Sequence, residues 1–413
     1  MEKTSVDRLQ PGIFVSLSSL GWLNHPFIAN EFCISNEKQI RVLKEMGLKE
    51  ISWDPARSTA KPLAEKSAVE EEDFGASALA GMLDEKRARI DRVRACREQF
   101  ARREREYEKH MNTAGDILRT AAGRPVEAYA RARDLVWRTT EGLIGAESEI
   151  IHLVNSKGKD TGAASHSVNV MVLSLLLGKA MGLTEEEMKY LGMGALLHDA
   201  GKSEVPQRIL RSDNRTKPEE DFYRGHVPFG IKVVAGMREI GVPVRNIIAC
   251  HHEHWDGSGY PNMLAAEKIP KLARIVALVN RYDNLCNPLD IKQAKTPAGT
   301  ITHLYKNEAA HFQPEILRAF VKMLGIFPPG SFVALSNGAV GLVIESNSAD
   351  MLHPLLMLHD AEIPRSEAIV LDLRDTDLSI ASAVNPATLP REIVEYLAPR
   401  GRVDYYVEPG NLS

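Results

Sequence analysis

A long stretch of helical hydrophobic periodicity, from Asp160 to about Pro328, restricts this chain to a mainly α architecture. In the segment HSVNVMVLSLLLGKAMG, the apolar residues Val170, Leu173, Leu177 and Met181 recur at helical spacing. The next segment opens with Thr184 and Glu187, which have the spacing of a capping box. The helix that follows should end near Gly201, a residue suited to a left-handed C-cap.

Different patterns precede this helical stretch. Residues 1–54 contain a strand-like run (GIFVSL), an amphipathic helix (NEKQIRVLKEMG) and a second strand-like run (LKEISW), which predicts a small N-terminal α/β domain. Residues 55–75 mix Pro, Ser, Ala and charge without periodicity, as in an exposed linker. Residues 76–156 have a helical pattern and are predicted to form a connector of one or two long helices.

The first part of the connector is rich in arginine, which raises the question of a nucleic-acid arm. Acidic residues interleave with the basic ones, at Asp91, Glu98, Glu104, Glu106 and Glu108. Such alternation is typical of a solvated helix or helix pair, whereas nucleic-acid arms carry blocks of one sign. We therefore expect no DNA partner, and a homodimer through this connector is a further expectation.

Residues 329–413 predict a small C-terminal β-rich domain. The run FVALSNGAVGLVIES places Asn337 and Gly338 between two β-rich segments, which is a strong hairpin signal. The segments MLHPLLMLHD and EAIVLDL have the composition of further strands.

Composition limits the class of protein. With 413 residues and 44% hydrophobic content, the chain is long enough for two or three domains. No apolar run reaches membrane-spanning length and the N-terminus lacks signal-peptide order, so we expect a cytoplasmic protein. The four scattered cysteines are expected to be reduced, structural thiols. Because the net charge is −4, an anionic substrate must be held by local charge or by metal.

Histidines concentrate in the helical stretch, where six of the thirteen fall between His166 and His254. A single histidine is more often a core or surface residue than a ligand, but this clustering favours a metal site. The carboxylate of Asp199, next to His198, has two oxygens that can bridge two divalent ions. Lys202 follows His198 by one helical turn and can meet a phosphate. The candidate ligands are His166, His198, Asp199, His226, His251 and His252.

Other histidines are not expected to take part. His254 lies two residues beyond His252 on what reads as the same helix, and should face away. His152, His303 and His311 lie outside any motif and are predicted to be ordinary core or surface residues.

The motifs HSVNV, LLHDAGK, HVPFG and HHEHWDGSGYP together resemble the HD-GYP subgroup of the HD phosphohydrolase superfamily. The resemblance runs from about residue 160 to residue 330, and the N-terminal region is similar to the small domain of unknown function that precedes many HD-GYP domains. It implies a helical-bundle phosphodiesterase with iron or manganese, which hydrolyses cyclic di-GMP to linear pGpG and, in some members, onward to GMP. It implies metal ligation by the six candidates above, with Asp199 and Lys202 as catalytic residues.

The resemblance also assigns residues that contact the substrate or a partner. Lys202 would bind the substrate, and Gly259, Tyr260 and Pro261 match the loop that shapes the substrate entrance. In the family this loop is implicated in contacts with diguanylate cyclase (GGDEF) domains. Glycine suits such a loop because a backbone that approaches a ligand closely has no room for a side chain.

Three positions depart from the family pattern. The stretch LVNRYDNL places Asn280 where the family has an aspartate ligand, while Asp283 matches a second, supporting aspartate. An amide oxygen can bind a metal but brings no negative charge. Gly162 stands where some members have a glutamate associated with a third metal, which favours a site for two divalent ions. The phosphate-binding segment reads LDIK, in which Lys292 is either a phosphate contact or a solvated lysine.

Two functions are therefore open. The chain is expected to be a hydrolase in which water attacks a phosphodiester, with no protein nucleophile. Alternatively, it is a catalytically weak receptor or interaction module for cyclic di-GMP, for which Asn280 and the missing arginine would be the signs. An HD enzyme for another nucleotide is disfavoured by the GYP loop.

Overall fold

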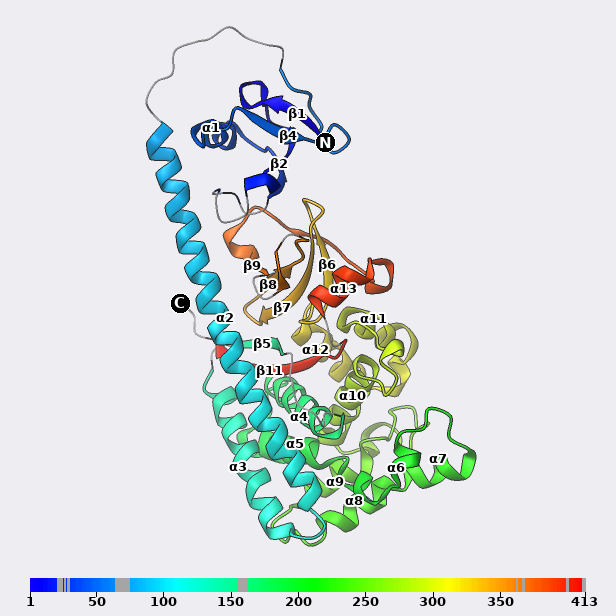
Figure 1. Ribbon diagram of the computed structural model, residues 1–413. Helices are drawn as coiled ribbons and strands as arrows, with labels where there is room; N and C mark the ends of the chain where they lie inside the picture. The colour runs from blue at the N-terminus through cyan, green and yellow to red at the C-terminus, as the bar shows by residue number, and fades with distance from the viewer. Residues whose placement is uncertain are drawn as a thin grey trace. The chain divides into compact units, whose positions relative to one another are not determined.

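The computed structural model describes residues 1–20, 25, 27, 30–63, 75–146, 148–154, 162–361, 363–365, 368–398 and 401–410. The chain divides into two compact units, residues 1–99 with 360–369 and residues 100–359 with 370–413 (Figure 1). Residues 64–74, most of the expected linker, lie outside the described residues.

The smaller unit is built on a four-stranded antiparallel sheet in the order β1-β4-β2-β3. Its strands are β1 (Glu2–Ser5), β2 (Phe14–Ser16), β3 (Glu31–Cys33) and β4 (Glu50–Trp53). Helix α1 (Glu37–Glu45) begins at Asn36, whose side chain accepts the N–H of Gln39, and it packs Leu43 into a core with Val15 and Trp53. The predicted α/β character is confirmed, and the short strands β1 and β3 are additions to it.

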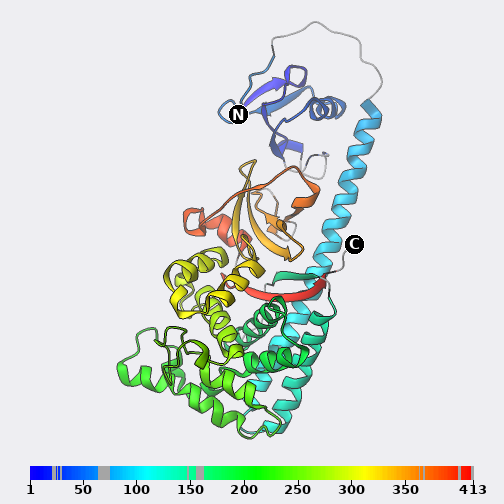
Figure 2. The same ribbon diagram turned by 180° about the vertical axis from the view of Figure 1, so that it is seen from behind.

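After β4, the described part of the chain is predominantly helical, as expected. Its helices are α2 (Gly75–Thr120), α3 (Pro125–Ile144), α4 (Gly162–Ala180), α5 (Glu185–Leu197), α6 (Gln207–Leu210), α7 (Lys217–Arg224), α8 (His226–Val234), α9 (Val242–Cys250), α10 (Lys271–Cys286), α11 (Pro297–Asn307), α12 (Pro314–Leu324) and α13 (Arg391–Leu397). Helix α4 is buried on nearly all sides, because it packs against α3, α5, α10 and α12 (Figures 1 and 2).

Helix α4 is also the one described helix that is long and apolar enough to cross a membrane by length and composition alone. Since 72% of its apolar window is buried inside the protein, its hydrophobicity is that of a core helix.

Helix α5 begins with the expected capping box, in which the Glu187 N–H donates to the Thr184 hydroxyl and the Thr184 N–H donates to the Glu187 carboxylate. The expected C-cap at Gly201 is wrong, because the helix ends at Leu197 and Gly201 lies in a following 3-10 turn, η4 (Ala200–Glu204). A Cβ on Gly201 would lie 2.0 Å from the His226 carbonyl oxygen and 2.3 Å from the Gly230 nitrogen. This glycine therefore permits close packing of η4 on α8.

A seven-stranded antiparallel sheet accompanies the helices. Its strands are β5 (Ser148–Val154), β6 (Phe332–Leu335), β7 (Val340–Asn347), β8 (Asp350–Leu358), β9 (Ile369–Asp372), β10 (Ile380–Ala383) and β11 (Asp404–Gly410). The order is β10-β6-β7-β5-β11, and β8 also pairs with β7 and β9. The predicted hairpin at Asn337 and Gly338 joins β6 to β7, with Gly338 at a φ of +83°.

Strand β5 corrects the prediction that residues 148–154 are helical. All seven residues pair with β11, from Asp404 opposite Val154 to Gly410 opposite Ser148. The run Ile150–Val154 has strand-forming residues, and its partner lies about 250 residues further along the chain, beyond the reach of local periodicity. The sheet therefore takes strands from both sides of the helical stretch.

Candidate functional site

The predicted ligands come together from the ends of four packed helices. His166 lies in the first turns of α4, and His198 and Asp199 follow the last residue of α5. His226 opens α8, and His251 caps α9, with His252 next in the chain. The expected helix bearing both adjacent histidines thus ends before either of them, at Cys250.

Asp199 is the centre of the cluster, because its two oxygens face different histidines. Oδ2 lies 3.5 Å from Nε2 of His166 and 3.4 Å from Nε2 of His198. Oδ1 lies 3.5 Å from Nε2 of His226 and 3.7 Å from Nε2 of His251. The cluster thus forms two groups with donor atoms within 4.8 Å of one another, and they share Asp199: one with His166 and His198, the other with His226, His251 and His252.

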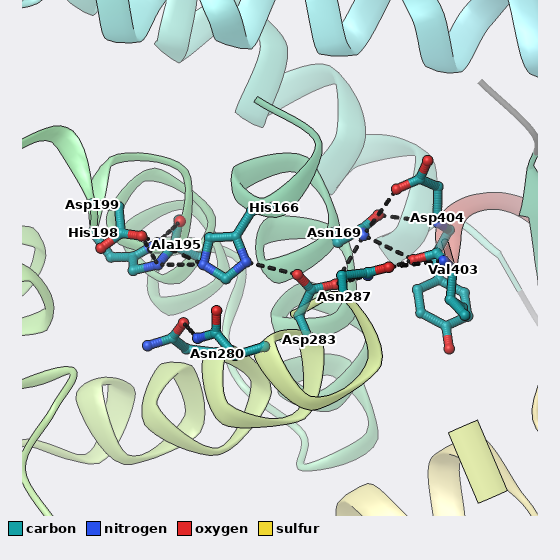
Figure 3. Close-up of polar contacts among 12 residues, drawn as sticks. His166, Asn169, Ala195, His198, Asp199, Asn280, Asp283, Asn287, Val403 and Asp404 are labelled. Carbon is teal, nitrogen blue, oxygen red and sulfur yellow. Dashed lines mark hydrogen bonds and ion pairs between the residues drawn. The ribbon is translucent and has the colours of Figure 1, made fainter. Parts of the chain in front are cut away.

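Hydrogen bonds fix which nitrogen of each histidine points into the cluster. The Nδ1 atoms of His198, His226 and His251 each lie 2.6–2.8 Å from a backbone carbonyl oxygen three residues earlier. A carbonyl only accepts, so each Nδ1 carries the proton and each Nε2 presents a lone pair. Nδ1 of His166 lies 2.6 Å from Oδ2 of Asp283, which fixes that ring in the same way (Figure 3).

This arrangement has the donor chemistry of a cation site. The Nε2 atoms face one another at 3.2 Å for His166 and His198, 3.4 Å for His226 and His251, and 3.1 Å for His226 and His252. Lone pairs at such distances repel unless a proton or a cation lies between them. Among the described residues, the buried Oδ1 of Asp199 has no hydrogen-bond partner. The cluster thus presents nitrogen and oxygen lone pairs that can bind divalent ions favouring such ligands.

The protonation states suit metal binding. Burial lowers the pKa of His226, and lowers the pKa of His251 and of His252 well below the ordinary histidine value. For Asp199, burial favours the neutral acid, but the Lys202 ammonium and the His198 imidazole outweigh it and hold the pKa well below its usual range. His226, His251 and His252 therefore offer neutral imidazoles, and Asp199 offers an ionised carboxylate.

Lys202 lies next to the shared carboxylate, a contact that the sequence did not predict. Its Nζ donates to Oδ2 of Asp199 and lies 5.7 Å from the centre of the Tyr223 ring. Burial disfavours the charged lysine, but Asp199 more than compensates and raises the pKa of Lys202. A permanent positive charge is thus held at the edge of the cluster.

Asn280 and Asp283 lie one turn apart on α10 and face different surroundings. Asp283 is hydrogen-bonded to His166, which fits the supporting role expected of it. Asn280 is buried and lines a cavity together with His251 and His252. Its Oδ1 accepts a hydrogen bond from Asn284 at 2.7 Å, which leaves one of its two lone pairs unused.

The GYP loop covers one side of the cluster. The Tyr260 ring stacks on the His252 ring, with centroids 4.6 Å apart and planes at 16°. A Cβ on Gly259 would lie 2.3 Å from the His254 nitrogen and 2.5 Å from the His252 carbonyl oxygen, so glycine allows the loop to fold back on this segment. The buried Glu253, not singled out from sequence, anchors the loop by accepting the N–H groups of residues 262 and 264 at 2.7 and 2.9 Å.

A cavity of about 340 Å³ adjoins the cluster and contains residues that the sequence did not point to. Arg281 donates to Glu308 through Nε at 2.8 Å and Nη2 at 2.6 Å, a bidentate pair. His254 and His311 also line the cavity, with rings stacked at 4.2 Å. The expectation that His254 faces away is wrong, because α9 has ended four residues before it.

Lys292 lies elsewhere in the described part of the chain. It belongs to the 3-10 turn η6 (Ile291–Gln293), where its side chain is exposed. Its backbone N–H donates to Asp290, and no described contact joins its ammonium group to the cluster or to the cavity.

Two domain families match the chain. The HD domain matches residues 145–316, and a domain of unknown function, DUF3391, matches residues 1–132. A cyclic di-GMP phosphodiesterase of Pseudomonas aeruginosa is 29% identical over 86% of this chain and 84% of its own length. The cyclic di-GMP phosphodiesterase response regulator RpfG of Xanthomonas campestris is 32% identical over 40% of this chain and 44% of its own. A 3′3′-cGAMP-specific phosphodiesterase of Vibrio cholerae is 29% identical over 42% of this chain and 33% of its own length.

Proposed function

Since this chain belongs to the HD-domain proteins of the HD-GYP type, with a DUF3391 domain on its N-terminal side, we propose that it is a metal-dependent phosphodiesterase that hydrolyses cyclic di-GMP. The products would be linear pGpG and then GMP, in bacterial second-messenger signalling. The names of the Pseudomonas and Xanthomonas relatives support this substrate.

The observation that carries the proposal is the division of the Asp199 oxygens between two sets of histidine nitrogens. We assign one divalent ion to His166, His198 and Asp199, and a second to Asp199, His226, His251 and His252, with iron or manganese as the metal. When bound, two such ions lower the pKa of water and neutralise charge on phosphate oxygens. Asn280 is proposed as a further, neutral ligand.

The protein groups around the cluster orient the substrate and hold charge. Lys202 keeps its ammonium beside the shared carboxylate, where it can stabilise an attacking oxygen or a phosphate oxygen. No serine or cysteine is needed as a nucleophile, and the described thiols of Cys250 and Cys286 are buried with raised pKa values.

The cavity suits a substrate with two anionic phosphates and two aromatic bases. Glu308 fixes the guanidinium of Arg281, and among the described residues none accepts a hydrogen bond from its Nη1. We assign the second phosphate to Arg281 in preference to the exposed Lys292. The stacked pair His254 and His311, which lines the cavity, offers an aromatic face for guanine.

We also propose the surroundings in which the enzyme acts. The GYP loop of Gly259, Tyr260 and Pro261 would shape the substrate entrance and contact diguanylate cyclase (GGDEF) domains, and α2 would pair two copies of the chain. The cytoplasm, where nucleotide messengers are made, is the proposed location. The mixed-sign charges of α2 give no support to a DNA partner.

A second candidate is a receptor that binds cyclic di-GMP without efficient turnover. The neutral Asn280, in a position where the family has a carboxylate, favours it. Both candidates predict binding of the nucleotide, and only the enzyme predicts metal-dependent turnover.

The test is hydrolysis of cyclic di-GMP by the purified protein with manganese or anaerobic ferrous iron, followed by chromatography of pGpG and GMP. Asp199→Ala and His198→Ala should lose metal and activity together, whereas Lys202→Ala should keep most metal and lose turnover. Full metal content and activity in the first two variants would refute the site. Tight nucleotide binding without turnover in the unmodified protein would support the receptor.

A further inference from the structure

A buried asparagine links the metal cluster to a strand that lies outside the matched HD domain. Asn169 is on α4, one turn after His166, and is 1% exposed. Its Nδ2 donates to Oδ1 of Asp283 at 2.9 Å, to the Val403 carbonyl at 3.1 Å and to Oδ1 of Asp404 at 3.3 Å (Figure 3). Its Oδ1 accepts the N–H of Tyr405 at 3.0 Å. The Asn169 carboxamide therefore joins α4, α10 and the start of β11.

A second asparagine, the C-cap residue of α10, makes the same connection. Asn287 donates to Oδ1 of Asp283 at 3.0 Å and to the Val403 carbonyl at 2.8 Å, and it accepts the Val403 N–H at 2.8 Å. The backbone of Val403 is thus held through both its N–H and its C=O. Both asparagines also bind the same carboxylate oxygen, so the position of Val403 and the orientation of Asp283 are coupled.

That orientation matters because Asp283 has two oxygens with different tasks. Oδ1 receives the two amide donors, and Oδ2 is left to face Nδ1 of His166 at 2.6 Å. A carboxylate that holds a ligating imidazole sets the direction and the basicity of its metal-binding nitrogen. Rotation of Asp283 would therefore move Nε2 of His166 away from the cluster.

The strand that holds these asparagines is itself firmly placed. Strand β11 pairs with β5 over seven residues, and β5 pairs with β7. The Tyr405 hydroxyl forms a 2.7 Å hydrogen bond with the hydroxyl of Tyr282, the residue before Asp283. Both tyrosines are fully buried. These contacts give β11 the rigidity that a positioning element needs.

We propose that the segment Val403–Tyr405 completes the active site, with Asn169 and Asn287 as positioning residues that hold Asp283, and through it His166, for metal binding. The inference rests on the proposed function, because it takes His166 as a ligand. It concerns the group of His166, His198 and Asp199, since Asp283 contacts no described histidine of the other group. Loosening the contact between Asp283 and His166 should selectively weaken the binding of one of the two ions.

The experiment measures how many manganese ions remain bound as a competing chelator is added to the full-length protein. The Asn287→Ala variant, at a half-buried position, should lose one ion at a chelator concentration about 10- to 100-fold lower than the unmodified protein does, and keep the other. Asn287→Leu has a similar branched side chain and removes both donors without adding charge. It should show the same loss of one ion, and it replaces the alanine variant if that variant does not fold.

Tyr282→Phe is the matched control. It removes the 2.7 Å hydrogen bond between the same strand and the same helix, but it leaves the contacts of Asp283 intact. It should lower the unfolding temperature without changing the chelator profile. Equal chelator profiles for the asparagine variants and the unmodified protein, or equal weakening in Tyr282→Phe, would overturn the inference. An unmodified protein that binds no metal would instead overturn the proposed function.

Discussion

Asn280 stands where the sequence resemblance expects an aspartate ligand, and it lines the cavity beside His251 and His252. The Asn280→Asp substitution adds one negative charge, so we expect slower metal loss in a chelator challenge and a modest change in activity. Asn284→Asp, which adds the same charge one turn further along α10, is the control. Equal retention in both variants would mean that charge, rather than ligation by residue 280, holds the metal. Hydrolysis that appears only in Asn280→Asp would favour the receptor.

Arg281, the residue after Asn280, also lines the cavity. Arg281→Ala should raise KM for cyclic di-GMP about 10- to 100-fold, because a charge-assisted contact with a phosphate contributes roughly 1.5–3 kcal/mol. The rate on bis(p-nitrophenyl) phosphate, which has one phosphate and no second site to fill, should stay unchanged. Arg318→Ala, at an exposed arginine paired with Glu315, controls for net charge. An unchanged KM in Arg281→Ala would remove the arginine from the substrate site.

Asp404 predicts a dependence of stability on pH. Burial, reinforced by the charge of Asp283, raises the pKa of Asp404 to about 6, above an unfolded value of about 3.9. The folded state therefore holds this proton more tightly, and the associated stability is present below about pH 4 and is lost as pH rises through 6. Asp404→Asn should increase the free energy of unfolding at pH 7.5 by up to about 3 kcal/mol, and by less at pH 5.

Glu408, on the same strand, provides the opposite case. The His152 imidazole, whose Nε2 lies 3.6 Å from Oε2 of Glu408, and Arg103 together outweigh burial and lower the pKa of Glu408 to about 2. Its contribution is present above about pH 4.5 and is lost toward pH 2, so Glu408→Gln should destabilise the protein at pH 7.5. Urea unfolding of both variants at pH 5 and pH 7.5 checks the two signs. Equal effects at the two pH values for Asp404→Asn would contradict the assignment.

At the scale of elements, the cluster depends on how closely η4 approaches α8. Gly201→Ala should displace these two elements, because the new Cβ would collide with backbone atoms at 2.0 and 2.3 Å, which no side-chain rotation relieves. We expect a loss of several kcal/mol of stability and of metal, since Asp199 and His226 lie on the two sides of this contact. Gly142→Ala, in helix α3 with nothing within 4 Å, is the control and should be neutral or slightly stabilising. Metal content and thermal unfolding distinguish the two.

The helices and strands also show which structural features the sequence alone predicts. The capping box at Thr184 and the hairpin at Gly338 have local signatures, and both were predicted. Residues 148–154 have strand-forming side chains, but only their pairing with β11 decides against a helix. His254 was misplaced because the end of α9 at Cys250 has no capping signal that a sequence displays.

The candidate site likewise contains residues that the sequence identifies and residues that it does not. His166, His198, Asp199, His226, His251 and His252 could be grouped because histidine is rare and the motifs are compact. Asn169, Asn287 and Arg281 could not, since asparagines and arginines are common on helices and gain meaning only from distant partners. Asn287 and Val403 are 116 residues apart in sequence, and no periodicity relates them.

At the scale of the whole molecule, metal should be part of the stability of the protein. Without cations, Nε2 lone pairs face one another at 3.1–3.4 Å in the cluster, which disfavours the folded arrangement. Manganese at about 100 times its Kd adds roughly 2.7 kcal/mol per site, enough to raise the unfolding temperature by about 5–10 °C. Calorimetry of chelated and reloaded protein measures this shift. Asp199→Ala should lose most of it, and an equal shift in that variant would indicate binding elsewhere.

The pairing of Val403 with Asn169 and Asn287 also orders events during synthesis. All the proposed metal ligands have been translated once the ribosome passes Asn280, but the backbone that orients Asp283 is made more than a hundred residues later. At about 5–20 residues per second, the interval from Asn287 to Val403 is roughly 6–23 s. During that time the nascent chain carries an incomplete metal site. We therefore expect tight metal uptake, and with it the proposed hydrolysis of cyclic di-GMP, to be delayed until the strand beginning at Asp404 has left the ribosome and paired with β5.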